Sequence, residues 1–225
     1  MRRVMAFLGA GLGLLASVAT AQQPAASPPP EQHVRGVIVG FEGDALKVKS
    51  PGGKALTLKL ADTTRVALAS KAGLGSIGQG GFIGTTAVPL ADGSLRAVEV
   101  HVFPEAMRGA GEGHRPWDLK PGSTMTNATV SAVEAAKGQP PSTMTNATVA
   151  KMAKAGSGLK LVLKYPAGEK TVFVSPTTPV VKLEPGDRSR LKPGAHVFAA
   201  YTRQPDGALL VLRVVVGEKG VRPPM

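Results

Sequence analysis

Residues along this chain recur at a fixed spacing of 114 positions, and this repeat limits the possible folds more than any other feature. Residues 60–66 resemble residues 174–180, so that Thr63 matches Thr177 (177 − 63 = 114). The dipeptide Asp92-Gly93 recurs as Asp206-Gly207, and the same spacing relates a further glycine and a further threonine: Gly80 with Gly194, and Thr57 with Thr171. Four agreements without a gap indicate an internal duplication.

Each copy has the pattern of short β-strands. Alternating apolar and polar residues or β-branched residues predict strands at 34–41, 45–49, 55–60, 81–87 and 95–103. The second copy predicts strands at 159–165, 170–174, 196–203 and 209–216. Turn signals rich in Pro, Asp and Gly stand at 51–53, 91–93, 166–168 and 205–207. Residues 70–80 and 184–194 each interrupt the strands, and we expect a short helix or a tight loop there.

These patterns predict an all-β protein with two tandem OB-like five-stranded small barrels related by internal duplication. Closing each barrel buries alternate residues and removes exposed strand edges. A β-sandwich of the same strands is the alternative. The expected domains are residues 34–103 and 146–217, joined by a connection at 104–145 and followed by a tail at 218–225.

A shorter repeat lies inside the connection. Residues 123–130 recur without a change at 142–149 (142 − 123 = 19). Each copy has the pattern of the first strand of the second barrel, which has room for only one. We expect one copy to pair into that barrel and the other to extend the linker.

The N-terminus has the three parts of a secretory signal peptide: Arg2 and Arg3, an apolar stretch, and small residues ending at Ala21. We expect residues 1–21 to be removed, residues 22–33 to form a Pro- and Ala-rich linker, and the protein to be periplasmic or secreted. The apolar stretch is too short to span a bilayer, and no later segment predicts a transmembrane helix. With no cysteine in the chain, disulfides and thiolate sites are excluded.

The chain is strongly basic, with 27 Lys and Arg against 15 Asp and Glu. Without Arg2 and Arg3 the balance is 25 − 15 = +10. This charge favours an anionic envelope component as partner, although scattered charges also simply maintain solubility. Nucleic acid is an unlikely partner, since six Phe, two Tyr and one Trp offer few surfaces for base stacking and the protein is expected outside the cytoplasm.

The central segment resembles a known family. Residues 99–109, residues 111–119 and the repeated 123–130 segment resemble a group of proteobacterial exported proteins with OB-like domains of unknown function. The resemblance covers nearly the whole chain after the signal peptide. It implies repeated β-barrels and export, and it assigns no activity. Such proteins are sometimes labelled metal ABC transporter permeases, a label that this sequence contradicts because it lacks membrane-spanning helices.

Residues 101–118 are the best candidate site in the sequence. Four residues there could bind a divalent metal: His101, Glu105, Glu112 and His114. Asp118 and Met107 lie in the same segment. Their spacings match no defined ligand pattern, and the alternative is a connection in which Trp117 and Phe103 pack between the barrels.

No arrangement of residues predicts catalysis. We therefore expect no catalytic residues, no bound cofactor and a non-enzymatic binding or adaptor module at the cell envelope. A periplasmic metal-binding protein that uses the 101–118 segment is the alternative, and a spacer formed by the barrels is a third hypothesis.

Overall fold

The computed structural model describes residues 29–136, 158–223 and 225. The predicted signal peptide, most of the predicted linker and the second copy of the nested repeat (142–149) lie outside these residues. The first strand begins at Glu31, so the end of the predicted linker belongs to the folded part.

The protein is all-β, and every helical element in the described residues is a 3-10 turn of three residues. Its strands are β1 (Glu31–Glu42), β2 (Ala45–Lys49), β3 (Ala55–Ala72), β4 (Phe82–Pro89), β5 (Leu95–Val102), β6 (Gly113–Pro116), β7 (Thr124–Ala136), β8 (Gly158–Tyr165), β9 (Gly168–Val174), β10 (Val180–Gly186), β11 (His196–Arg203) and β12 (Leu209–Gly217). The 3-10 turns are Leu74–Ser76, Glu105–Met107 and Arg188–Arg190.

Five strands from the two ends of the described chain form a closed barrel, which we call the terminal barrel. Their pairing order is β1-β2-β3-β12-β11 and back to β1. The β3–β12 pair is parallel, and the other four pairs are antiparallel. Alternation along each strand turns one face inward, where side chains such as Ile38, Leu46, Leu58 and Val214 are buried completely or nearly so.

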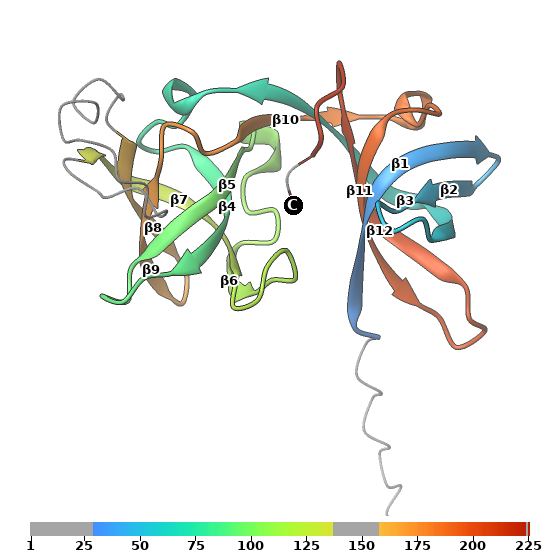
Figure 1. Cartoon of the computed structure of the whole chain (residues 1–225), viewed down its shortest axis with the longest axis horizontal. Helices are drawn as coiled ribbons and strands as arrows, with labels where there is room; N and C mark the ends of the chain where they lie inside the picture. Colours follow the sequence, from blue (N-terminus) through green and yellow to red (C-terminus); the bar gives the residue numbers. More distant parts are fainter. Residues whose placement is uncertain (1–28, 137–157, 224) are drawn as a thin grey trace, which may run out of the picture.

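The middle of the chain forms a second group of strands, which we call the central lobe (Figure 1). Its strands pair in the order β5-β4-β7-β8-β9, and the outer two, β5 and β9, also pair over a short parallel stretch. Its own apolar core includes Ile83, Val100, Val130 and Leu161. Strand β6 lies beside β7.

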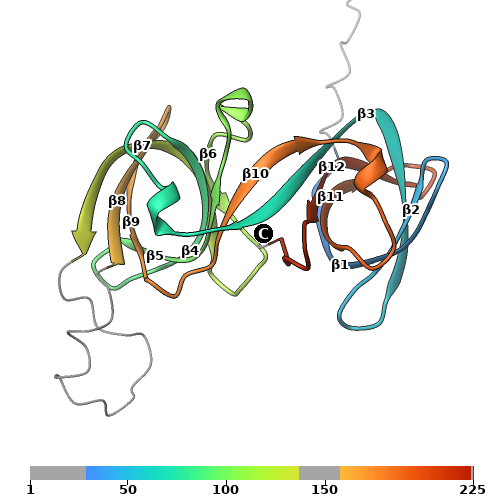
Figure 2. The same ribbon diagram turned by 90° about the horizontal axis from the view of Figure 1, so that it is seen from above.

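Two strands cross between these parts. Strand β3 pairs with β2 over its first residues, pairs with β12 as far as Ala69 and leads to β4. Strand β10 leads back from the central lobe to β11 and runs antiparallel to the second part of β3, from Val66↔Gly186 to Ala72↔Val180. Figures 1 and 2 show these two strands side by side across the molecule.

This pairing differs from the expected tandem arrangement. We expected each barrel to contain consecutive strands, from residues 34–103 and from residues 146–217. Instead the terminal barrel joins β1, β2 and β3 to β11 and β12, and the central lobe joins β4 and β5 to β7, β8 and β9. Strands β3 and β10, which pair with each other, carry the chain from one part of the molecule to the other, so that the terminal barrel is not made of consecutive strands alone.

A third apolar cluster, which we call the interface cluster, lies between the terminal barrel and the central lobe. Its buried members come from the crossing strands, from β7, β11 and β12, from the segment after β6 and from the C-terminus: Ala67, Ala69, Trp117, Met125, Val181, Leu183, Phe198, Ala200, Val215 and Met225. Phe103 packs against it. The predicted packing role of Trp117 and Phe103 is therefore confirmed.

The predicted strand positions are largely correct. Strands β2 and β11 have the predicted bounds, and the other predicted strands are present with shifted ends. The first copy of the nested repeat forms the beginning of β7 and pairs with β4, although the expected second domain began with the second copy. Strands β6 and β10 and the second part of β3 were not predicted.

Candidate ligand-binding cleft

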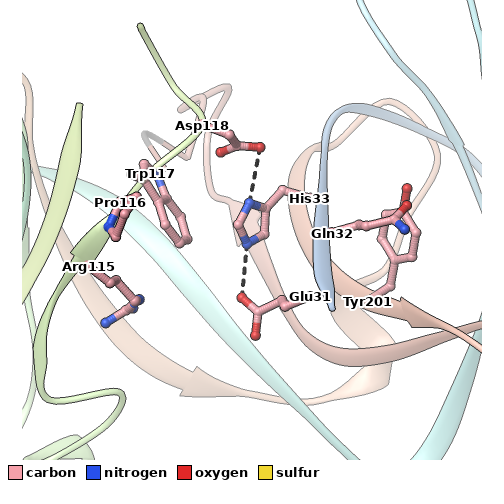
Figure 3. Close-up of a pocket in the computed structure, with 8 residues that line it drawn as sticks. All are labelled: Glu31, Gln32, His33, Arg115, Pro116, Trp117, Asp118 and Tyr201. Carbon is pink, nitrogen blue, oxygen red and sulfur yellow. Dashed lines mark hydrogen bonds and ion pairs between the residues drawn. The ribbon is translucent and has the colours of Figure 1, made fainter. Parts of the chain in front are cut away.

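An open cleft of about 780 Å³ lies between the terminal barrel and the segment that follows β5 (Figure 3). Strand β1 contributes Glu31, Gln32 and His33, and β11 contributes Tyr201. The facing wall consists of β6 and the residues after it: Arg115, Pro116, Trp117 and Asp118. The volume lies in the range of small-molecule sites, about 300–1,000 Å³.

His33 stands in the middle of the cleft between two carboxylates. Its Nε2 lies 2.9 Å from Glu31 Oε1, and its Nδ1 lies 3.1 Å from Asp118 Oδ2. Figure 3 shows the three side chains in one column, with Trp117 beside the imidazole. The ring centroids of His33 and Trp117 are 4.3 Å apart. An imidazole donates to both carboxylates only when both ring nitrogens carry hydrogen.

Two arginines also donate hydrogen bonds to the carboxylates of Asp118 and Glu31. Arg35 donates to both oxygens of Asp118, at 2.7 and 3.3 Å. Arg213 donates to both oxygens of Glu31, at 2.6 and 3.1 Å. Such two-pronged pairs fix the orientation of a carboxylate as well as its charge. Both carboxylates are therefore already occupied by groups of the protein.

The pKa values of these carboxyls reflect their partners. The hydrogen bond from His33, assisted by Arg213, lowers the pKa of Glu31 to about 2 against the opposing effect of burial. Burial raises the pKa of Asp118, but Arg35 and His33 together outweigh it, so that this pKa lies below its ordinary value. Both groups are anionic at neutral pH.

Arg115 differs from these arginines. It donates to the backbone oxygen of Gly111 at 2.8 Å, and its guanidinium carbon lies 5.5 Å from the centre of the Trp117 ring. Within the described residues it forms no ion pair. Burial and the neighbouring charge of Arg213 lower the pKa of Arg115, and Glu31 opposes this only in part. Arg115 is thus a half-buried cation without a carboxylate partner, at the wall of the cleft.

A smaller inner cavity of about 140 Å³ adjoins the cleft and shares Arg115 and Trp117 with it. Most of its wall is apolar and belongs to the interface cluster or packs against it, including Phe103, Met107, Met125 and Phe198. Two polar side chains from the central lobe, His101 on β5 and Asn127 on β7, also line it.

The four predicted metal ligands do not meet in one site. His101 is buried on β5, whereas Glu105 is exposed and pairs with Arg108. Glu112 is exposed in the loop before β6. His114 Nδ1 lies 2.8 Å from Thr126 Oγ1, and its ring stacks on Tyr165.

The described residues contain no group of three or more potential metal ligands. Burial and the charges of Lys170 and Arg115 lower the pKa of His114. The same positive charges would repel a metal cation.

Sequence reasoning found one wall of the cleft and missed the other. Trp117 and Asp118 lie in the segment that was singled out as the candidate site. Glu31 and His33 lie in the predicted linker, and no local signal marks them, because their role depends on pairing with residues more than 80 positions away.

Comparisons with protein-family models, with curated proteins and with solved structures found no match. The resemblance to exported proteobacterial proteins therefore remains a prediction. In the parts of the chain that the structure describes, no helix has the length and apolar character needed to cross a membrane.

Proposed function

We propose that the molecule consists of two duplicated OB-like barrels that have exchanged strands. The order β1-β2-β3-β12-β11, with a parallel pair between the third strand and the last, is the order of an OB-type barrel. In the central lobe β7, β8 and β9 take the places of the first three strands, and β4 and β5 take the places of the last two. The β5–β9 pair is parallel as well.

The strand registers support this duplication. Val66 pairs with Val214, and Val180 pairs with Val100, so both partners shift by the repeat (180 − 66 = 114 and 214 − 100 = 114). At the crossing, Ala69 pairs with Leu183, which is its own counterpart (183 − 69 = 114). A residue that pairs with its own counterpart is expected on a two-fold axis between the copies.

We further propose that the protein is an exported, non-enzymatic binding or adaptor module whose inter-lobe cleft takes an anionic envelope component. The observation that carries the proposal is Arg115. A guanidinium that is half-buried, placed over an aromatic ring and without a carboxylate partner is suited to bind a carboxylate or a phosphate. The other cations of the cleft already have partners.

The net charge supports the same class of ligand. A balance of +10 after the predicted signal peptide attracts polyanions over the whole surface. The metal-binding alternative gains no support from the positions of His101, Glu105, Glu112 and His114. Nucleic acid is not proposed, because few aromatic side chains are available for stacking.

The test is the binding of an acidic polysaccharide, polygalacturonate, to the purified protein by calorimetry, with neutral dextran as the reference. Arg115→Gln removes the unpartnered cation. Arg96→Gln is the matched control, because Arg96 is also half-buried, forms no ion pair within the described residues, and lines neither the cleft nor the inner cavity.

We expect saturable binding of polygalacturonate that weakens at least tenfold in Arg115→Gln and much less in Arg96→Gln. Equal weakening in both variants would assign binding to general surface charge and contradict a role for the cleft. Absence of binding to the unaltered protein would contradict an anionic polysaccharide as ligand.

A further inference from the structure

The inner cavity contains most of the unpartnered buried polar groups of the described chain. Four buried side-chain atoms of the described residues have no hydrogen-bond partner: Thr85 Oγ1, His101 Nε2, Trp117 Nε1 and Asn127 Oδ1. The last three belong to residues that line the inner cavity. Buried polar groups without protein partners are rare in folded proteins, and three such groups around one cavity make it a candidate site for a polar ligand.

One hydrogen bond fixes the orientation of the Asn127 side-chain amide. Its Nδ2 donates to the backbone oxygen of Ala110 at 2.9 Å, which leaves Oδ1 as the free acceptor. The side chain is only 7% exposed, so bulk solvent does not satisfy this atom. An acceptor in this position is complemented by an N–H or O–H group of a ligand.

His101 is equally constrained. Its side chain is 2% exposed, and Nε2 lies 3.5 Å from Glu99 Oε1 without the alignment of a hydrogen bond. Glu99 instead accepts a hydrogen bond from Thr86 Oγ1 at 2.6 Å. Nε2 is therefore a buried imidazole nitrogen whose hydrogen-bonding capacity is unused.

Gly84 on β4 allows these two polar residues to approach each other. A Cβ at this position would lie 2.6 Å from Asn127 Oδ1 and 3.2 Å from His101 Nδ1. Any side chain at residue 84 would therefore displace Asn127, His101 or both. The glycine keeps both polar side chains at the wall of the cavity.

Two donors lie where the inner cavity meets the cleft. Trp117 Nε1 is a donor without an acceptor, and Arg115 carries the unpartnered guanidinium described above. Together they suit a negatively charged oxygen group. The remaining walls include two further arginines, Arg65 and Arg213, and apolar side chains such as Phe103, Met107 and Met125, which suit a short aliphatic group.

We propose that the inner cavity binds the end group of a small 2-hydroxy or 2-amino carboxylic acid. The carboxylate meets Arg115 and Trp117 Nε1, the adjacent hydroxyl or amino group donates to Asn127 Oδ1, and a methyl-sized side chain contacts the apolar wall. The cavity of about 140 Å³ has room for four to five water molecules at about 30 Å³ each. An acid of about three carbons occupies a comparable space.

This inference rests on the proposed function, since it makes the inner cavity the anchor for one end of the anionic ligand. The probes are L-lactate, D-lactate, L-alanine and D-alanine, titrated into the purified protein and followed by the tryptophan side-chain NH signal in proton NMR. Propionate lacks the adjacent donor, and methyl lactate lacks the carboxylate charge.

Trp117→Phe is the decisive variant, because it removes the Nε1–H group and keeps an aromatic ring in the interface cluster. Its binding is measured by calorimetry, since the variant has no tryptophan. Tyr165→Phe is the control, because it also removes one polar atom from an aromatic side chain but lies outside both cavities.

We expect saturable binding of at least one lactate or alanine enantiomer, with propionate and methyl lactate at least tenfold weaker. Trp117→Phe should weaken binding at least tenfold, and Tyr165→Phe should leave it unchanged. The proposal is overturned if none of these acids binds, if propionate binds equally well, or if Trp117→Phe binds like the unaltered protein.

The polygalacturonate measurement separates this inference from the proposed function. If polygalacturonate binds through Arg115 while the small acids do not bind, the inner cavity is not the anchor and the proposed function stands. If Arg115→Gln leaves polygalacturonate binding intact, the proposed function fails first.

Discussion

His33 connects the two walls of the cleft through charges that come from both of them. Glu31 belongs to β1, while Asp118 follows β6 on the facing wall. Arg213 and Arg35 complete the network from β12 and β1. Such partly exposed networks are worth more than an isolated surface pair, because each charge has several fixed partners.

Glu31 should make the stability of the protein depend on pH in the acid range. The pKa of this carboxyl is about 2 in the folded protein and near 4.5 when unfolded. A lowered folded pKa means that the contribution is present above pH 4.5 and is lost as the pH falls toward 2. Because the side chain is 34% exposed, solvent screening reduces its contribution to about 1 to 2 kcal/mol.

We therefore predict that Glu31→Gln lowers the free energy of unfolding above pH 5 and that the difference from the unaltered protein disappears near pH 2. Urea unfolding at a series of pH values measures both. Glu169→Gln is the control, because Glu169 is exposed and forms no ion pair within the described residues. A difference that persists unchanged to pH 2 would contradict the assignment.

At the scale of elements, the crossing of β3 and β10 joins the terminal barrel to the central lobe. The two strands pair over seven residues, and their apolar side chains enter the interface cluster. Leu183 lies at the centre of the pairing, opposite Ala69, and is only 2% exposed. Its packing stabilises both the crossing and the contact between the two parts.

We predict that Leu183→Ala destabilises the protein by about 2 to 4 kcal/mol, because it leaves a cavity in a buried cluster. Leu212→Ala is the matched control, since Leu212 is 39% exposed and should lose far less. Chemical denaturation with tryptophan fluorescence measures the change and reports directly on Trp117 in the same cluster. Equal effects of the two substitutions would show that the crossing contributes little.

The sequence predicted those strands whose own residues alternate, such as β2 and β11. It missed the second part of β3, where Ala67, Ala69 and Ser70 lack the β-branched side chains typical of strands and where burial comes from β10 and β12. It also missed β10, which follows Pro179 and contains Pro185. The cleft has the same limit: Asp118 lay in the predicted segment, but its partner Arg35 is 83 positions away.

At the scale of the whole molecule, local sequence cannot distinguish exchanged from tandem barrels. Each copy offers equivalent strands to β3, so β12 and β5 compete for the same place. In the structure Leu210 of β12 pairs with Lys59 of β3. In a tandem arrangement its counterpart, Arg96 of β5, would occupy that position (210 − 96 = 114). The course of the two crossing strands, β3 and β10, distinguishes the exchanged arrangement from the tandem one.

Engineered cysteines should distinguish the two arrangements, since the chain has none of its own. We predict that Lys59→Cys with Leu210→Cys forms an intramolecular disulfide on mild oxidation, because paired strand residues lie within disulfide range. Lys59→Cys with Arg96→Cys should remain reduced. Non-reducing gels and peptide mass spectrometry give the result, and a disulfide-linked dimer would indicate exchange between two molecules instead.

The terminal barrel is discontinuous in the chain, because its first three strands end at Ala72 and its last two begin at His196. The strands of the central lobe all lie between Phe82 and Val174. As the chain emerges with its N-terminus first, all strands of the central lobe are therefore available before β11 and β12, and until then β1 and β3 each have one unpaired edge. Closing such a long loop is slow. We therefore expect the pairing of β11 with β1 and of β12 with β3 to limit the rate of folding. The unpaired edges of β1 and β3 are the part that a chaperone would need to protect.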